Sequence, residues 1–216
     1  MSRSRDPVLT TTTYALLSHL SLKPWSAYEL AVQRVRYFRF FWPRAQRGIY
    51  IELKRLHALG LAEAEITYVG RRARTVYTIT DNGRQALEAW LDQPVSPIAV
   101  EFEGLLRLFS APLGTKDQLL STLGQVRADV AEMTALNDGI ITEYADGRAP
   151  FQHQAYVRTL VVDFVTQFLA GTEAWVERTI TEVDTWDDMT STGKPLRTLE
   201  RLSHERLGRR PPSRHD

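Results

Sequence analysis

The sequence predicts a mainly α-helical protein with one small β-hairpin, in which an N-terminal winged helix-turn-helix is followed by a C-terminal domain of long helices. Three observations lead to this fold class. A helical apolar pattern after Pro43 changes at Gly60 to the alternation that is typical of strands. Arginines cluster at the turn between the two expected strands. Residues 116–145 and 151–183 each carry a long apolar pattern at helical spacing.

The expected helix after Pro43 has one apolar and one polar face. Spacings of three and four place its apolar residues on one side: Ile49, Leu53, Leu56 and Leu59. The other side carries Arg47, Tyr50, Ile51 and Lys54. Gly60, followed by the apolar Leu61, predicts the end of the helix, because glycine readily adopts the left-handed conformation of a C-cap. Gly48 in the first turn is expected to cost about 1 kcal/mol relative to alanine.

A hairpin and a short helix are expected next. Residues 62–68 alternate small or apolar with polar side chains, and residues 74–80 are rich in strand-forming side chains. The turn between them falls at 70–72. Thr80 is expected to cap a helix over 81–92.

The helix and the hairpin would present basic side chains to the same partner. The hairpin carries three arginines with no acidic residue among them. Arginine and lysine neutralise DNA phosphates, whereas a few side chains at base edges read the sequence. The expected base readers are Gln46, Arg47, Tyr50 and Lys54. The complete set of expected DNA contacts is Gln46, Arg47, Tyr50, Lys54, Arg71, Arg72 and Arg74.

Spaced motifs in this region resemble the PadR-type transcriptional regulators. The family's F-W-P run is matched by Phe41, Trp42 and Pro43. Its I-Y-x-x-L-x-R-L-x-x-x-G-L run is matched by Ile49, Tyr50, Leu53, Arg55, Leu56, Gly60 and Leu61. Its third run is matched by Tyr77, Ile79, Thr80, Gly83, Arg84, Leu87, Trp90 and Leu91. The resemblance implies a winged-helix regulator and, in one branch of the family, a helical C-terminal dimerisation domain.

Two helices are expected before the basic one. The first, over about 9–20, buries its leucines. Ser26 and Glu29 form a capping box in which each side chain satisfies a free amide, so a second helix is expected to begin at residue 27. The aromatic run 37–43 is interpreted as core or interdomain packing, with a ligand pocket as the alternative.

Composition indicates a globular protein of a reducing compartment. The hydrophobic fraction of 43% is ordinary for such a chain, and the absence of cysteine excludes disulfides, thiolate metal sites and cysteine nucleophiles. No apolar run approaches the ~18 residues of a membrane span, and the first ten residues lack the apolar core of a signal peptide. We therefore expect a cytoplasmic protein with no membrane contact and no cofactor.

Charge and proline placement predict three parts. Two prolines mark the boundary between a DNA-binding domain, 1–93, and a helical dimerisation or effector domain, 98–190. Residues 1–93 hold 14 Lys and Arg against 8 Asp and Glu, whereas residues 94–190 hold 6 against 15. An acidic domain would be kept away from DNA. Residues 191–216 are interpreted as a basic tail that is partly disordered.

Residues 116–145 have the alternating spacing of a coiled-coil seam, with Asn137 at an a position. A buried asparagine there would specify register, and the alternative is that Leu136 takes the buried place. The long helices expose so much apolar surface that we expect a two-fold dimer, which would place two reading helices one turn of a palindromic operator apart. The expected interface is Leu119, Leu123, Val126, Val130, Met133, Asn137, Ile140, Phe164, Phe168 and Trp175.

Two further expectations concern the C-terminal domain. A helix over 101–110 is expected to turn Phe102, Leu105, Leu106 and Phe109 inward. If the protein senses a small aromatic effector, as the resemblance implies, flat ligands would stack in an apolar pocket. The candidate pocket residues are Trp42, Phe164, Phe168 and Trp175, for each of which an ordinary core role is the alternative.

These observations favour a homodimeric repressor that binds an operator and is not an enzyme. The alternative is a winged-helix protein-interaction module without DNA binding, which the departures from the family pattern at Ala45 and Gly48 would support. Such a module does not need basic residues on both the helix and the hairpin. An enzyme acting on nucleic acid would need clustered acids or metal ligands, whereas the five histidines are scattered along the chain.

Overall fold

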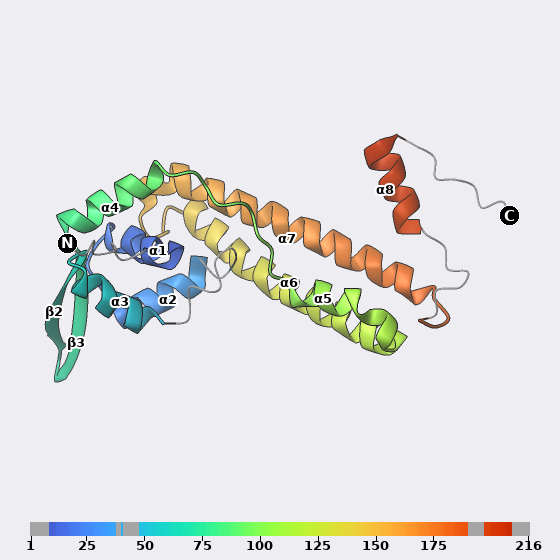
Figure 1. Ribbon diagram of the computed structural model, residues 1–216, viewed down its shortest axis with the longest axis horizontal. Helices are drawn as coiled ribbons and strands as arrows, with labels where there is room; N and C mark the ends of the chain where they lie inside the picture. The colour runs from blue at the N-terminus through green and yellow to red at the C-terminus, as the bar shows by residue number, and fades with distance from the viewer. Residues whose placement is uncertain (1–8, 38–39, 41–47, 190–196, 209–216) are drawn as a thin grey trace, which may run out of the picture. The chain divides into compact units, whose positions relative to one another are not determined.

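The computed structural model describes residues 9–37, 40, 48–189 and 197–208. The chain divides into two compact units, residues 1–98 and 99–216, and each unit is described by itself. Both are built mainly from helices, and the described strands belong to one small antiparallel sheet, which confirms the predicted fold class (Figure 1).

The N-terminal unit packs its helices at the base of a long hairpin (Figure 1). The helices are α1 (Thr11–Leu20), α2 (Ala27–Tyr37), α3 (Ile49–Ala58) and α4 (Asp81–Leu91). The sheet has the order β1-β3-β2, with β1 (Trp25–Ser26), β2 (Ala62–Val69) and β3 (Arg72–Ile79) all antiparallel to their neighbours. The hairpin pairs Ala62 with Ile79 at its base and Val69 with Arg72 at its tip, and we call residues 62–79 the wing.

Leucines from three helices form the core of this unit. The fully buried ones are Leu16, Leu17, Leu20, Leu30, Leu53 and Leu56. The predicted capping box is confirmed, because the Ser26 amide and hydroxyl both donate to Glu29 Oε2 at 2.8 Å and the Glu29 amide donates back to Ser26 Oγ. Strand β1 is too short to be visible as a pattern, and its pairing with β3 ties the start of α2 to the wing.

A close junction joins α3, the wing and α4. Gly60 has φ +68°, and the Leu61 amide donates to the Leu56 carbonyl, so the predicted glycine stop of α3 is confirmed. Thr80 caps α4 by accepting from the Gly83 amide at 3.1 Å. A Cβ at Gly83 would lie 2.2 Å from the Leu61 carbonyl oxygen. Helix α4 therefore approaches the end of α3 more closely than any side chain at this position would permit.

The C-terminal unit is organised around two long antiparallel helices that lie side by side (Figure 1). Its elements are α5 (Glu103–Phe109), η2 (Ala111–Leu113), α6 (Lys116–Ala145), η3 (Gln152–Gln154), α7 (Ala155–Asp184) and α8 (Arg197–Leu207). At one end of the pair the Lys116 ammonium donates to the Asp184 and Trp186 carbonyls at 2.9 and 2.7 Å. Helix α8 falls within the segment that the sequence had indicated as a basic tail.

The predicted seam of α6 is covered by α7 of the same chain. Most of the seam residues are buried in the single chain, among them Leu119, Leu123, Val126, Val130, Asn137 and Ile140. Within the chain the heptad spacing of α6 therefore has its partner in the next helix, α7.

Asn137 settles the register of this helix pair. Its side chain is 2% exposed and donates from Nδ2 to Thr166 Oγ1 at 2.8 Å, whereas Leu136 is 42% exposed. The a-position interpretation of Asn137 is therefore confirmed, and the alternative with Leu136 buried is wrong. Thr166 also donates to the Val162 carbonyl, which satisfies its hydroxyl proton within α7.

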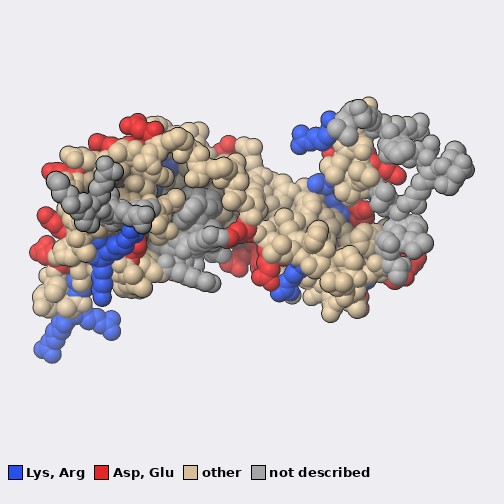
Figure 2. All heavy atoms as spheres, viewed as in Figure 1, with Lys and Arg blue, Asp and Glu red and all other residues tan. Residues whose placement is uncertain are grey.

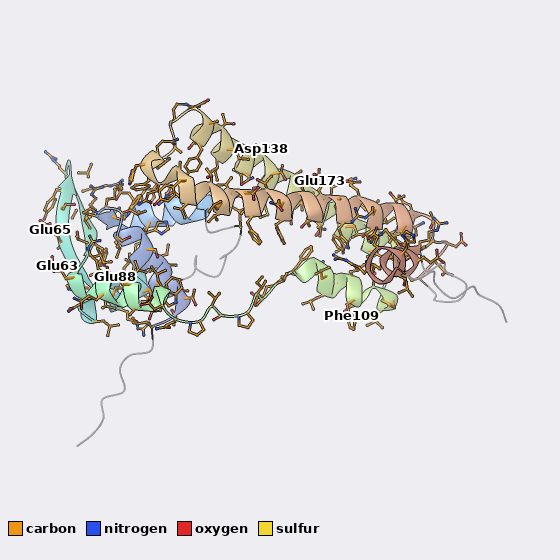
Figure 3. All side chains as sticks on the ribbon, turned by 90° about the horizontal axis from the view of Figure 1, so that it is seen from above. Glu63, Glu65, Glu88, Phe109, Asp138 and Glu173 are labelled. Carbon is orange, nitrogen blue, oxygen red and sulfur yellow. The ribbon has the colours of Figure 1, made fainter. Side chains whose placement is uncertain are left out.

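The inward orientation predicted for the helix over 101–110 is only partly correct. Phe102 precedes α5 and packs edge-on against Trp175, with ring centroids 6.1 Å apart. Leu105, Leu106 and Phe109 are exposed, and Figure 3 shows Phe109 at the end of α5. The helix is short and lies on α6 along one narrow line, so most of its apolar side chains have no cover within the chain.

Within the described residues, no helix is long and apolar enough to cross a membrane.

Candidate nucleic-acid interface

Helix α3 is held in place by a buried hydroxyl of α1. Thr13 is fully buried, and its Oγ1 donates to Glu52 Oε1 in the first turn of α3 at 2.5 Å. The same carboxylate oxygen accepts from Arg55 at 3.0 Å, one helical turn further on. Because Glu52 is fixed from both sides, the rotation of α3 about its own axis is fixed as well.

The rotation of α3 leaves one face open to solvent, which we call the outer face and define as Tyr50, Ile51 and Lys54. Tyr50 is 60% exposed and Ile51 is 74% exposed, and Lys54 is also exposed. Gln46 and Arg47, the other two expected base readers, lie outside the described residues. Two of the four expected base readers, Tyr50 and Lys54, are therefore on the outer face.

Gly48 does not lie inside the first turn of α3, as the sequence had suggested. It is the N-cap residue, with φ +85°, and its carbonyl accepts from the Glu52 amide at 2.9 Å. Left-handed backbone favours glycine, so the residue suits the cap rather than weakening the helix interior. Gly48 itself supplies no side-chain cap to the amides at the start of α3.

The tip of the wing carries its basic charge. Arg71 follows Gly70 in the two-residue turn, and Arg72 opens β3 opposite Val69. Both arginines are exposed, and within the described part of the chain neither forms an ion pair. Figure 2 shows basic side chains gathered at this end of the unit. Two guanidinium groups at the wing tip are thus available to an anionic partner.

Arg74, the third expected arginine of the wing, is already engaged. Its Nη1 lies 3.4 Å from Glu29 Oε1 in the first turn of α2, and its Nε donates to Thr67 Oγ1 at 3.3 Å. This ion pair joins the middle of the wing to the body of the unit. Arg74 is half-exposed, so it can also meet an anion, but only in competition with Glu29.

The base of the wing is acidic where the tip is basic. Glu63 and Glu65 are exposed on β2, and they share one face of the sheet with Arg74, Arg72 and Thr67 (Figure 3). A carboxylate at the base repels a phosphate backbone that arginines at the tip attract. The charge pattern therefore allows an anionic polymer to contact the tip and keeps it from the base.

The pKa of the Glu29 carboxyl is held below its ordinary value. The largest cause is the hydrogen bond from the Ser26 amide, followed by the bond from the Ser26 hydroxyl, and the positive charges of Arg74 and Lys23 act in the same direction. Glu29 is therefore ionised at neutral pH and serves two purposes, since it caps α2 and binds the wing.

Sequence reasoning missed the contacts that position the site. The capping-box motif assigned Glu29 to α2 alone, and nothing in the spacing between residues 29 and 74 indicated an ion pair. The hydrogen bond from Thr13 to Glu52 joins residues 39 positions apart. Its only sequence signal is a threonine on the same helix face as Leu16, Leu17 and Leu20, where a polar residue needs a buried partner.

A cavity of about 450 Å³ lies in the C-terminal unit between α5, α7 and α8. Two indoles and three guanidinium groups are among its lining side chains, together with Leu108: Trp175, Trp186, Arg178, Arg197 and Arg201. Arg201 pairs with Glu205 at 2.8 Å. Arg178 and Arg197 form no ion pair within the described residues, and with Glu182 as the one acidic lining residue the cavity wall is basic on balance.

The expected effector pocket is not assembled as the sequence had suggested. Trp175 lines the cavity, but Phe164 and Phe168 are exposed on α7, where their rings stack on each other with centroids 6.5 Å apart. Trp42 lies outside the described residues. The three described side chains follow α7 over about three turns, and a single helix face does not enclose a ligand.

Curated relatives match less than half of the chain. A probable transcriptional regulator of Mycobacterium tuberculosis is 33% identical over 85 residues, which cover 39% of this chain and 45% of that protein. The negative transcriptional regulator PadR of Bacillus subtilis is 32% identical over 99 residues, which cover 44% of this chain and 54% of that protein. The chain thus spans about half the length of the curated relatives it matches.

Solved structures extend the similarity of fold to most of the chain. Bacillus subtilis PadR in complex with operator DNA superposes with a TM-score of 0.66 at 22% identity, over 81% of this chain and 100% of that chain. The same protein in complex with p-coumaric acid superposes with a TM-score of 0.58 at 22% identity, over 81% and 99%. At this identity the structures establish the fold alone. Residues 16–89 match the Transcriptional regulator PadR-like family, so this part of the chain carries a domain similar to that family.

Proposed function

We propose that the protein is a DNA-binding transcriptional regulator that represses its target genes as a homodimer on a palindromic operator. The observation that carries this proposal is the pairing, in one unit, of the exposed outer face of α3 with the two unpaired arginines at the wing tip. Helix α3 has a size suited to the major groove, and the wing tip would meet neighbouring phosphates. The resemblance to Bacillus subtilis PadR, which has been solved with operator DNA, supports this assignment.

The proposed contacts differ in kind. Arg71 and Arg72 would bind phosphates and supply affinity on any sequence, whereas Tyr50 and Lys54 would reach base edges. Arg74 would contribute less, because it competes with its own partner Glu29. We keep Gln46 and Arg47 in the proposed contact set on the sequence pattern alone. A protein-interaction module would have no use for the unpaired arginines, which is why DNA is the preferred partner.

A second copy of the chain is the proposed cover for an apolar stripe on α7. Six large side chains in the first half of this helix recur at helical spacing and are exposed in the single chain: Tyr156, Val157, Leu160, Val161, Phe164 and Phe168. Apolar surface of this extent usually marks an interface. A two-fold pair buries the same stripe on both subunits and gives the operator its palindromic symmetry. The buried seam residues of α6 would pack behind this interface and would not themselves contact the second copy.

The dimer can be tested by replacing Phe164 and Phe168 together with aspartate. Sedimentation equilibrium should give twice the chain mass for the wild type and the chain mass for the double variant. Val95→Asp is the control, since it introduces the same charge at an exposed apolar side chain away from α7. If the wild type is a monomer at micromolar concentration, the proposal of a dimer is wrong. If the double variant is still a dimer, the interface lies on a surface other than this stripe of α7.

DNA binding is tested with the duplex that lies immediately upstream of the protein's own gene and with a scrambled duplex of equal length. The proposal expects preferential binding of the upstream duplex, with two chains per site and a protected footprint of two half-sites about 34 to 36 Å apart. Equal binding of both duplexes would mean that the operator lies elsewhere in the genome. If neither duplex binds at low salt, DNA is not the partner.

For the effector we propose a planar aromatic carboxylate in the cavity between α5, α7 and α8. Trp175 and Trp186 offer ring faces for stacking, and Arg178 and Arg197 offer charge to a carboxylate. The cavity of about 450 Å³ has the size of small-molecule sites. Bacillus subtilis PadR has been solved with p-coumaric acid, which belongs to this chemical class.

The effector site is tested by titrating tryptophan fluorescence with p-coumaric acid and with its uncharged amide. The acid should quench the fluorescence in a saturable manner and the amide should not, and Arg178→Ala together with Arg197→Ala should abolish the effect. Arg206→Ala, also on α8 but not among the lining residues, is the control. Equal binding of acid and amide would show that the arginines do not select the ligand, and no saturable change would remove the effector from this cavity.

A further inference from the structure

We infer that Ile51 reads a C5-methyl group in the major groove of the operator, so that the protein selects thymine at one position of each half-site. This inference rests on the proposed DNA binding and adds a specificity-determining residue to it. Ile51 was expected on the outer side of the helix but was not among the expected base readers, and its side chain cannot donate or accept a hydrogen bond. Its position and exposure instead allow it to recognise an apolar group of a base by direct contact.

Ile51 is exposed where a reading helix meets the bases. It lies in the first turn of α3, and the N-terminal residues of a recognition helix are the ones that contact base edges. At 74% it is among the most exposed isoleucines of the described chain, although the apolar face of α3 lies directly behind it. The contact from Thr13 to Glu52 fixes this orientation, so Ile51 cannot turn inward without breaking it.

Because of the residues around Ile51, an apolar contact is the main way in which the first turn of α3 can recognise a base. Helix α3, Ile49–Ala58, contains no Asn or Gln, and its one arginine, Arg55, is held by Glu52. Apart from Lys54, which can bind guanine, this helix therefore offers none of the usual bidentate readers of adenine and guanine. His57 is directed back to the Ala62 carbonyl at 3.1 Å through Nδ1. Tyr50 and Lys54 read bases through hydrogen bonds, and Ile51 supplies the apolar surface beside them.

The chemistry that Ile51 fits is a methyl group in the plane of a base. Thymine is the only standard base that displays one in the major groove, where it is contacted by apolar side chains. Burying one methyl group between the base and the isoleucine would strengthen binding about four-fold per half-site. 5-Methylcytosine displays a methyl group at the same place, so the shared feature is the C5-methyl and not the hydrogen-bonding edge of thymine.

The test removes single methyl groups from the operator. In the duplex bound under the proposed function, each thymine of one half-site is replaced in turn by deoxyuridine, which lacks only the methyl. Wild-type protein should lose about four-fold in affinity at one of these positions, and Ile51→Ala should bind thymine and uracil alike there. At the same position, 5-methylcytosine should bind about four-fold more tightly than cytosine to the wild type and equally to Ile51→Ala.

Two further variants separate this role from a general weakening. Ile51→Val keeps both branches at Cβ and should retain most of the uracil effect. Ile66→Ala removes a similarly exposed isoleucine from the wing, and it should retain the full effect whatever it does to overall affinity. Uracil effects that are absent at every position, or equal in wild type and Ile51→Ala, would overturn the inference while specific DNA binding stands. Absence of any preferred duplex would instead overturn the proposed function.

Discussion

The guanidinium of Arg74 lies 3.4 Å from the carboxylate of Glu29, so that strand β3 of the wing is joined to the first turn of α2. Glu29 also accepts two hydrogen bonds from Ser26, and one acidic residue thus caps a helix and pairs with the wing. The pair is half-exposed, where an ion pair contributes little stability, so its main effect is on the charge that the wing presents.

Replacement of Glu29 by glutamine should strengthen DNA binding at low salt. The change removes a negative charge beside the proposed phosphate surface and frees Arg74 for a phosphate. The slope of log affinity against log salt should steepen by up to about 0.9 per subunit. Glu88→Gln, at an exposed glutamate on α4, removes the same charge elsewhere and should leave the slope unchanged. Equal slopes for all three proteins would show that Arg74 does not reach the DNA.

The same substitution should lower stability in a pH-dependent way. The pKa of Glu29 is lower in the folded protein than in the unfolded chain, so its ionised form stabilises the fold above the unfolded pKa. This contribution is lost as the pH falls through the lowered folded pKa. Urea unfolding at pH 7 should therefore find Glu29→Gln less stable by about 1 kcal/mol, and the difference should shrink in acid below the ordinary carboxyl pKa. A difference that is constant with pH would contradict the ionised cap.

Thr13→Val should destabilise the N-terminal unit and weaken DNA binding together. The variant keeps the shape of the side chain but removes the buried hydroxyl that binds Glu52 and accepts from the Thr10 amide. Loss of a buried hydrogen bond to a charged group costs about 1–3 kcal/mol. Thr11→Val is the control, because Thr11 lies at an exposed position of the same helix. It should stay within about 0.5 kcal/mol of wild type. Equal stabilities of the two variants in urea would show that α3 is not held through Thr13.

Gly83→Ala should destabilise the protein by about 1–3 kcal/mol, because the added methyl would collide with the Leu61 carbonyl at the junction of α3, wing and α4. Gly139→Ala is the matched control. It lies inside α6, where an added Cβ meets nothing within 4 Å, and it should stabilise the protein by about 0.5–1 kcal/mol. Thermal unfolding of both variants measures the difference, and a stabilised Gly83→Ala would mean that the junction is looser than described.

The local features of the fold could be predicted from the sequence because each is set by residues close in the chain. The glycine stop at Gly60, the capping box at Ser26 and the a-position of Asn137 are of this kind. The partner of the α6 seam could not be predicted in the same way, since heptad spacing is identical whether the facing helix comes from the same chain or another. In this chain the turn after residue 145 leads α7 back along α6, so the helix that faces the seam comes from the same chain.

The sequence predicts which charged residues form the candidate site, but it does not predict the contacts that hold them in place. The arginines at 71 and 72 stand out in the sequence and lie at the wing tip, as expected. Arg74 looks equivalent to them in sequence, yet it is paired across 45 residues with Glu29. Helical spacing already places Ile51 on the outer side of its helix, and its exposure of 74% agrees with that placement, but spacing did not mark it as a base reader.

The most direct test of the account is the salt dependence of binding to the upstream duplex, compared between wild type and the double variant Arg71→Ala/Arg72→Ala. We expect the slope of log affinity against log salt to fall by about 0.9 for each phosphate contact that is lost. Arg148→Ala/Arg158→Ala, which removes the same charge from the C-terminal unit, should keep the wild-type slope. An unchanged slope in the wing variant would contradict the claim that α3 and the wing together bind DNA.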